Sequence, residues 1–297
     1  MQPRLITLTT DFGVRDAYAA AMKAVIMSVA GTHARLLDVS HEVAPQDVME
    51  AAFVLRATLP YLPADSVHVV VVDPGVGSAR RPVAIRVGDT HFVGPDNGVI
   101  PLILDQQKPD EIVVLDNRRF WRTEEPSATF HGRDIFAPAA AHLATGVQLG
   151  SLGSRTDVLQ PLHWALPIVD DQGIRGWIVH VDRFGNCVTN ITADHAGELT
   201  SSERQRTKIY VGSARLEGIH RTYADVADGD PVAVIASTGF VEIAVNGGDA
   251  ATLLGIRKGS PVNLLYADTD ESRGSDAGRG GEEQPQAIHA SEPSHHA

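Results

Sequence analysis

The sequence is short of several features that would point to other classes of protein. Its 297 residues include one cysteine, Cys187, which rules out an internal disulfide and a zinc site built from several cysteines. No apolar run approaches the ~20 residues of a membrane-spanning helix, and the first residues lack a basic stretch leading into an apolar core. We therefore expect a cytoplasmic protein that is neither exported nor inserted in a membrane.

Positive charge is also scarce. The chain has 25 Lys and Arg against 37 Asp and Glu, a formal net charge of −12. Because nucleic-acid affinity depends on clustered Lys and Arg, we expect no nucleic-acid partner. The sequence also lacks the GK[ST] ending of a P-loop, a GxGxxG fingerprint and an HExxH motif. We predict no bound nucleotide phosphate, no metal and no cofactor.

Apolar content is ordinary, at 43% hydrophobic residues, and the length favours two domains. Strand-like and helix-like segments alternate in the first half, beginning at Leu5, Asp16, Ala34, Pro45 and Ser66, with further strands from Pro82, His91 and Glu111 and a helix from Ala137. This alternation predicts an N-terminal α/β domain over residues 1–166, with a mainly parallel sheet covered by helices on both faces.

The second half has a different pattern. Short strand signals recur without long helices at residues 176–182, 207–212, 231–237, 240–246 and 261–268. They predict a smaller C-terminal antiparallel β-barrel domain over residues 167–267. Residues 268–297 are rich in Gly, Ser, Glu and Pro and almost lack large apolar groups, which predicts a disordered tail.

Polar residues follow several of the predicted strands of the first domain. Asp11 in TTDFG follows the first strand, Asp73 follows the third, and Asp96 and Asn97 in GPDNG end a later one. Ligands of open parallel sheets bind at the carboxyl ends of strands, so these positions are candidates for a site. Each one alone is also ordinary turn chemistry, because Asp beside Gly or Pro is common in turns and caps.

The loop VVDPGVGSARR and the segment TFHGRD carry the more informative residues. Gly75 and Gly77 allow close approach of the backbone, and Arg80 places a permanent charge near Asp73. A surface ion pair is the simpler interpretation. His131 precedes a predicted helix, where it is either a residue of the capping turn or a titratable group facing the same crevice.

Six motifs occur in one order: TTDFG, VVDPGVGSARR, GPDNG, TFHGRD, VDRFGNCVTNI and STGFVEIAVNGG. Together they resemble the S-adenosylmethionine hydroxide adenosyltransferase family, relatives of fluorinase and chlorinase, from about Ile6 to Leu265. The resemblance implies an N-terminal α/β domain, a C-terminal β-barrel and a homotrimer. It also implies active sites between the first domain of one subunit and the second domain of its neighbour.

The implied activity is hydrolysis of S-adenosyl-L-methionine to adenosine and L-methionine. In the family the matched Asp, Arg and His position and activate water, and they correspond here to Asp73, Arg80 and His131. Asp11 corresponds to the carboxylate that holds the ribose hydroxyls, a suitable partner for a vicinal diol. Either His131 or Asp73 takes the proton from water, and the sequence leaves that choice open.

The resemblance also implies residues on the barrel side. Asp182 and Asn186 correspond to the pair that engages the methionine portion and the adenine edge, and Ser237 to a contact of the methionine carboxylate. Backbone groups of Val245 and Gly247 would face adenine. Glu242 and Asn246 share that segment.

Other activities remain as alternatives. A halogenase would have an aromatic residue where Asp73 stands and an extra loop between the segments matching Arg86 and Phe92, and a carboxylate would repel a halide. A non-catalytic adenosine or S-adenosylmethionine sensor would dispense with the water-handling trio. A metal-dependent hydrolase would need clustered His and Asp ligands. Gln46 replaces an aromatic residue that lines the fluorinase pocket, so how this side of the pocket packs on the substrate stays open.

Overall fold

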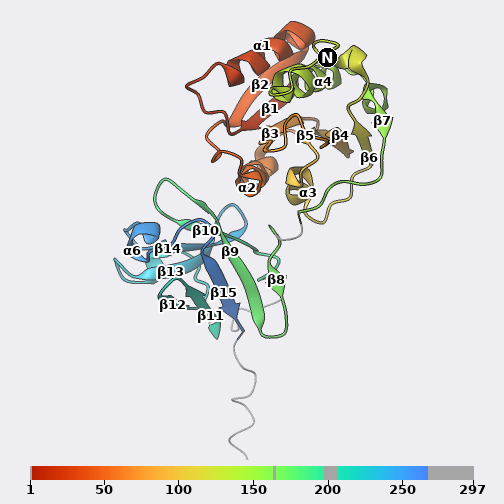
Figure 1. The fold of residues 1–297 in the computed structure, drawn as a ribbon. Helices are drawn as coiled ribbons and strands as arrows, with labels where there is room; N and C mark the ends of the chain where they lie inside the picture. The colour runs from red at the N-terminus through yellow and green to blue at the C-terminus, as the bar shows by residue number, and fades with distance from the viewer. Residues whose placement is uncertain (1, 163–164, 197–205, 267–297) are drawn as a thin grey trace, which may run out of the picture. The chain divides into compact units, whose positions relative to one another are not determined.

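A computed structural model describes residues 2–162, 165–196 and 206–266 (Figure 1). The first sheet has the strand order β2-β1-β3-β5-β4-β6-β7. Its strands are β1 (Arg4–Thr10), β2 (Ala34–Ser40), β3 (Val67–Val71), β4 (Pro82–Val87), β5 (Thr90–Pro95), β6 (Glu111–Val114) and β7 (Ser154–Arg155). The pairs β1–β2, β1–β3 and β3–β5 are parallel, whereas β4–β5, β4–β6 and β6–β7 are antiparallel. The α/β class is confirmed, and the sheet is mixed because the hairpin turn at Gly88 and Asp89 reverses the chain.

Helices cover both faces of this sheet, as predicted. They are α1 (Tyr18–Ala30), α2 (Val48–Thr58), α3 (Val99–Leu104) and α4 (Ala137–Ala144), with short 3₁₀ turns η1 (Gly31–His33), η2 (Leu59–Tyr61), η3 (Arg118–Phe120) and η5 (Leu149–Leu152). One buried cluster joins α1 and α4 to Ile6 and Leu8, and another joins α2 and α3 to Val70 and Ile85. Neighbouring residues of the strands thus face opposite helix layers, the alternation expected of a pleated sheet.

The register of β1 and β3 brings the first candidate residues together. Thr10 at the end of β1 pairs with Val71 at the end of β3, so Asp11 and Asp73 leave the sheet at the same edge. His131 stands directly before the π-helical turn η4 (Gly132–Phe136), which leads into α4. Such wide turns are rare and occur frequently at functional sites.

The second sheet is antiparallel, has the order β12-β11-β15-β9-β10-β14-β13 and nearly closes into a barrel. Its strands are β8 (Ile168–Val169, paired with β9), β9 (Gly173–Val181), β10 (Cys187–Thr192), β11 (Lys208–Val211), β12 (Ala214–Glu217), β13 (Pro231–Ile235), β14 (Phe240–Val245) and β15 (Pro261–Leu265); η7 (Tyr223–Asp225) and α6 (Ala250–Leu253) are its short helices. A bridge between His220 and Val234 links the two edges. The predicted barrel is confirmed.

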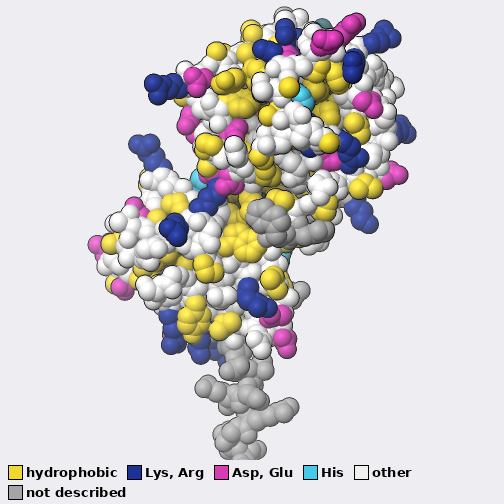
Figure 2. All heavy atoms as spheres, viewed as in Figure 1, with side chains coloured by type: hydrophobic (Ala, Val, Ile, Leu, Met, Phe, Trp, Pro, Cys, Tyr) yellow, Lys and Arg dark blue, Asp and Glu magenta, His cyan; other side chains and the backbone are white. Residues whose placement is uncertain are grey.

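Residues up to Tyr266 form one compact unit that contains both sheets. The predicted domain limits at 166 and 267 stay predictions, and the predicted tail at 268–297 lies outside the described residues. Lys and Arg side chains are dispersed among acidic ones on the face shown in Figure 2. No helix within the described ranges is long and apolar enough to cross a membrane.

Candidate active site

The loop after β3 is pressed against the segment that carries His131. Gly77 has φ +77°, and a Cβ there would lie 2.5 Å from the backbone oxygen of Ala128. Both the left-handed conformation and the close approach therefore require glycine. The same loop is closed by backbone hydrogen bonds from Val76 to Asp73 and from Ser78 to Gly75. The fold of this loop sets the position of Arg80.

Asp73, Arg80 and His131 meet in one hydrogen-bonded group. Nε of Arg80 donates to Oδ1 of Asp73 over 3.0 Å, and its Nη2 donates to Oδ2 of Asp73 and to Nδ1 of His131, the latter over 2.7 Å. The side chains of Arg80 and Asp73 are 8% and 5% exposed. The guanidinium lies 5.3 Å from the ring centroid of Phe136. Asp73 and His131, which are 58 residues apart in the chain, are thus joined by hydrogen bonds to the same guanidinium.

Arg80 also determines the tautomer of His131. A guanidinium has only donors, so Nδ1 of His131 must be the acceptor, and a neutral ring then carries its proton on Nε2. Burial, and then the charge of Arg80, lower the pKa of His131 from its ordinary value of 6.5. The neutral ring is therefore the stable form at neutral pH.

Asp11 shares a cavity of about 320 Å³ with this group. The cavity is lined by Asp11, Phe12, Tyr18, Pro45, Gln46, Val71, Asp73, Val76, Thr129, Phe130, His131 and Gly132. The backbone N–H of Gln46 donates to Oδ2 of Asp11 over 2.7 Å. The structure thus brings all four predicted residues of the first domain to one place.

The predicted barrel residues gather at a second cavity. Asp182 and Asn186 form a tight turn, with the Asn186 backbone N–H and side-chain amide donating to the carboxylate of Asp182 over 2.9 and 3.0 Å. Asn186, Val245 and Asn246 line the cavity, whose volume is about 470 Å³. This lining has no residue in common with the Asp11 cavity.

Glu242 and Ser237 stand apart from the others. Glu242 is buried and accepts a 2.7 Å hydrogen bond from the hydroxyl of Tyr223. Burial raises the pKa of Glu242 against the effect of that hydrogen bond, and the charge of Asp182 raises it further. Ser237 is exposed in the turn before β14, at the opposite end of that strand from Val245. A six-residue strand spans about 20 Å, so only an extended ligand could touch both ends.

Comparison with known proteins identifies the family. The model of the SAM hydroxide adenosyltransferase N-terminal domain matches residues 6–153, and that of the C-terminal domain matches residues 176–263. The chain belongs to the SAM hydroxide adenosyltransferase family. Within it, the chain is 40% identical to an (R)-S-adenosyl-L-methionine hydrolase of Thermus thermophilus, over 88% of this chain and 100% of that protein.

More distant and structural relatives agree with membership of the SAM hydroxide adenosyltransferases. A fluorinase of an Actinoplanes species is 25% identical, over 89% of this chain and 98% of its own length. The crystal structure of a conserved protein from Thermotoga maritima superposes with a TM-score of 0.78 at 36% identity, covering 88% of this chain and 100% of that one. The hydrolase relatives are therefore nearer in sequence than the fluorinase.

Two aromatic residues beside the predicted barrel residues were not predicted from the sequence. Phe184 and Tyr223 line the barrel cavity, and Gln46, which lines the Asp11 cavity, also contributes a backbone N–H to Asp11. Phe184 stands between Asp182 and Asn186 in VDRFGN, a signal that could have found it. No group of three His, Cys, Asp or Glu residues in the described ranges is placed to hold a metal.

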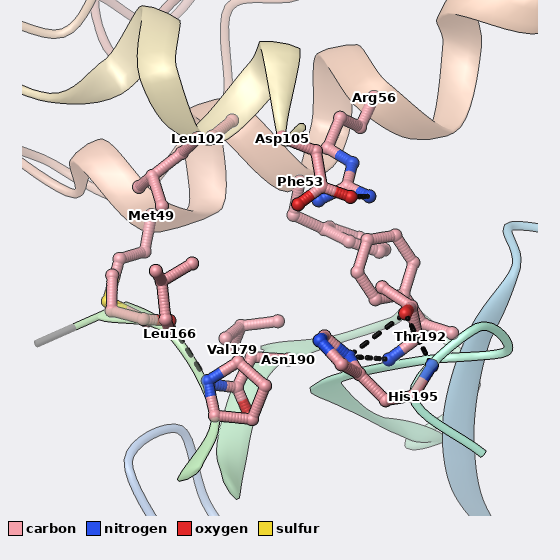
Figure 3. Close-up of a pocket in the computed structure, with 14 residues that line it drawn as sticks. Met49, Phe53, Arg56, Leu102, Asp105, Leu166, Val179, Asn190, Thr192 and His195 are labelled. Carbon is pink, nitrogen blue, oxygen red and sulfur yellow. Dashed lines mark hydrogen bonds and ion pairs between the residues drawn. The ribbon is translucent and has the colours of Figure 1, made fainter. Parts of the chain in front are cut away.

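A further cavity contains none of the predicted site residues (Figure 3). Apolar side chains of α2, including Met49 and Phe53, form part of its lining together with Val179 of the barrel. Its polar groups pair with one another: Arg56 donates to Asp105 over 2.9 Å, and Thr192 and His195 are 2.9 Å apart. This cavity is a contact region between α2 and the barrel, separate from the Asp11 cavity.

Proposed function

We propose that this protein hydrolyses S-adenosyl-L-methionine to adenosine and L-methionine by in-line attack of an activated water at C5′. The observation that carries the proposal is the buried Arg80, which donates to both Asp73 and His131, the two residues that line the cavity together with Asp11. Relatives at 32–41% identity are named (R)-S-adenosyl-L-methionine hydrolases, which supports the same reaction here.

The chemistry needs a nucleophile more than an acid. Water oxygen forms a bond to C5′ while the C5′–S bond breaks, and the electron pair leaves with sulfur as neutral methionine. The protein must therefore take a proton from water, whose pKa in bulk is about 15.7. Preorganised charge near the attacking oxygen stabilises its hydroxide character, and this is the role we assign to Arg80.

Asp73 is the better candidate to accept that proton. The acceptor nitrogen of His131 is already occupied by Arg80, so the ring presents an N–H from Nε2 that can orient the water. Each oxygen of Asp73 accepts one bond from Arg80 and retains a second acceptor site. Asp73 thus takes the proton, and His131 and Arg80 hold the oxygen in line with C5′.

We further propose a homotrimer in which the barrel cavity of one subunit completes the Asp11 cavity of its neighbour. Asp11 would hold the ribose diol, while Asp182, Asn186, Glu242, Val245, Asn246 and Ser237 would hold adenine and methionine. Exposed apolar side chains support this arrangement. Tyr18 lines the first cavity and nearby Val14 is 75% exposed, while Phe184 lines the second and is 76% exposed. Contact with a neighbouring subunit would remove the apolar area of these side chains from water and so stabilise the trimer.

Product analysis tests the reaction. Purified protein is incubated with the (R) and (S) sulfonium epimers of S-adenosyl-L-methionine in buffer with and without a chelator, and with and without chloride, and the products are separated by chromatography. Adenosine plus methionine from the (R) epimer is the expected result, at the same rate with and without chelator, because no metal or other cofactor takes part. Formation of 5′-chloroadenosine, or bound but unchanged substrate, would contradict the proposal.

A mixing experiment tests the shared site. Asp73→Asn removes the first half-site and Asn186→Ala the second, so each variant alone should have little activity. After the two are unfolded and refolded together, about one quarter of the sites in random trimers would combine two intact halves. Recovery of activity in the mixture is expected. A mixture as inactive as its parents would place both halves of the site in one chain.

We also propose a cytoplasmic location, on the sequence grounds given above.

A further inference from the structure

A short segment before α2 forms part of the wall around Asp11. Gln46 in this segment has φ +66°, a conformation that non-glycine residues rarely adopt. Its backbone N–H points at Oδ2 of Asp11, 2.7 Å away. Residues held in this region of φ and ψ persist only when their surroundings determine them, so the neighbours of the segment must maintain this hydrogen bond.

The first turn of α2 holds the segment on one side. Asp47 is the N-cap of α2, and its side chain accepts a hydrogen bond from the backbone N–H of Glu50 over 2.9 Å. Oε2 of Glu50 in turn accepts from the backbone N–H of Ala44 over 3.1 Å. Ala44 and Asp47 flank Gln46 and are bonded to each other through the backbone. The buried carboxylate of Glu50 therefore closes the loop that presents the Gln46 N–H.

The barrel supplies two side chains that hold Glu50. Nδ1 of His180, on β9, lies 2.7 Å from Oε1 of Glu50, and the His180 ring stacks on Phe53 with centroids 5.1 Å apart. Nζ of Lys258 donates to Oε2 of Glu50 over 2.7 Å and also pairs with Asp47. Backbone hydrogen bonds between the segment after Lys258 and Ile178 fix this lysine beside β9.

These contacts form a continuous series from the barrel to the ribose carboxylate. Lys258 and His180 hold Glu50, Glu50 holds Ala44, and the loop from Ala44 to Asp47 presents Gln46 to Asp11. Pro45 and Gln46 line both the Asp11 cavity and a neighbouring cavity whose lining includes Trp177 and Lys258. Lys258 and the Asp11 cavity therefore lie on opposite sides of the wall formed by Pro45 and Gln46.

We propose that Glu50, His180 and Lys258 are positioning residues for the ribose of the substrate, acting through the Gln46 N–H on Asp11. This inference rests on the proposed function, in which Asp11 holds the ribose hydroxyls. The group orients the Asp11 carboxylate before substrate arrives, so its contribution appears in recognition of the diol. Because the diol is held equally in substrate and transition state, loss of the group raises KM and leaves kcat nearly unchanged.

The test compares adenosine with 2′,3′-dideoxyadenosine, which lacks the diol. Dissociation constants for both are measured by calorimetry in wild type and in Lys258→Met, and the ratio of the two constants reports recognition of the hydroxyls. We expect the preference for adenosine to fall about tenfold, equivalent to about 1.4 kcal/mol. The KM for S-adenosyl-L-methionine should rise by a similar factor while kcat stays within about threefold. Lys258→Arg, which keeps the charge, should retain the wild-type ratio, and Glu50→Gln should lower it as Lys258→Met does.

Arg56→Met is the matched control. Like Lys258, Arg56 is a cation at the contact between α2 and the barrel: it pairs with Asp105 (Figure 3). Its guanidinium lies 5.1 Å from the ring centroid of Phe240 on β14. It has no contact with the Gln46 segment, so its removal should leave the adenosine preference unchanged. If Lys258→Met and Glu50→Gln weaken both nucleosides equally, the group is merely structural and the inference is overturned. If wild type neither binds adenosine nor hydrolyses the substrate, the proposed function itself fails.

Discussion

Arg80 can be changed to lysine without removing the positive charge that the buried carboxylate of Asp73 needs. Lysine places one compact ammonium where arginine has a planar fork, so it cannot bond both oxygens of Asp73 and His131 together. Arg80→Ala is less informative, because an unpaired buried carboxylate would destabilise the fold by about 3–5 kcal/mol. Arg80→Lys separates the geometry of the site from its net charge.

The size of the effect follows from the three hydrogen bonds that Arg80 donates. If the ammonium remains with Asp73, His131 loses its donor, its tautomer is no longer determined, and one preorganised donor near the attacking oxygen is lost. Removal of one such donor lowers kcat by about 10²–10³, or about 2.7–4 kcal/mol. Asp11 and Gln46 are untouched, so the affinity for adenosine should change less than about threefold.

The assay measures adenosine release at saturating substrate, with calorimetry of adenosine binding. Arg81→Lys is the control, since the adjacent Arg81 also pairs with an aspartate: its Nε donates to Asp96 over 2.9 Å, and its Nη2 donates to the backbone of Val158 over 2.6 Å. This variant should melt at a lower temperature but keep its kcat within about threefold. A kcat for Arg80→Lys close to that of wild type, or equal losses in both variants, would refute the reasoning.

Three further predictions follow. Because burial and Arg80 lower the pKa of His131, the acid-side inflection of kcat/KM should lie below pH 6.5, since the protonated ring can no longer accept from Arg80; an inflection at or above 6.5 would contradict this. Burial opposes the charge on Glu50, but hydrogen bonds from His180 and Lys258 outweigh it and lower the pKa of Glu50 from 4.5 to about 2. The resulting stabilisation, about 3 kcal/mol, is present above pH 4.5 and is lost as pH falls toward 2. The free energies of unfolding of wild type and Glu50→Gln, measured in urea, should therefore converge over that range, and a constant difference between them would disprove this prediction. Gly77→Ala should lower both the melting temperature and kcat by straining the loop against Ala128, by about 1–3 kcal/mol in stability, whereas Gly88→Ala, whose Cβ would meet open space, should leave kcat unchanged.

Most elements of the fold were predictable because their signals are local. The strand at Ala34–Ser40 lies where the sequence placed it, and α2 (Val48–Thr58) follows directly after the predicted helix start at Pro45. The orientation of β4 was missed, although the two-residue Gly88–Asp89 connection is a hairpin signal. β10 (Cys187–Thr192) and α3 (Val99–Leu104) were not predicted, since short apolar runs fit helix and strand alike.

The site was predictable as a set of residues but not as a geometry. Asp11 and Asp73 could be placed at one sheet edge because both follow buried strands. The contact of Arg80 with His131 depends on Gly77 fitting against Ala128 and on the π-helical turn after His131, which no periodicity indicates. The resemblance gave Ser237 and Val245 contacts with different parts of one ligand, and the structure shows that the length of β14 separates the two residues.

The adjacent residues Arg80 and Arg81 have different partners: Arg80 donates to Asp73 and His131 at the proposed water site, and Arg81 pairs with Asp96, which also accepts from Gln160, and donates to the backbone of Val158. Deletion of one residue between Asp73 and Arg80 would bring Arg81 to the position of Arg80, and insertion of one residue would bring Ala79 there, so either change would remove Arg80 from its place beside Asp73 and His131. Loop length is therefore a hard constraint for anyone grafting this site onto another scaffold. Designs that vary the residues of the loop at constant length should retain a water site, and designs that vary its length should not.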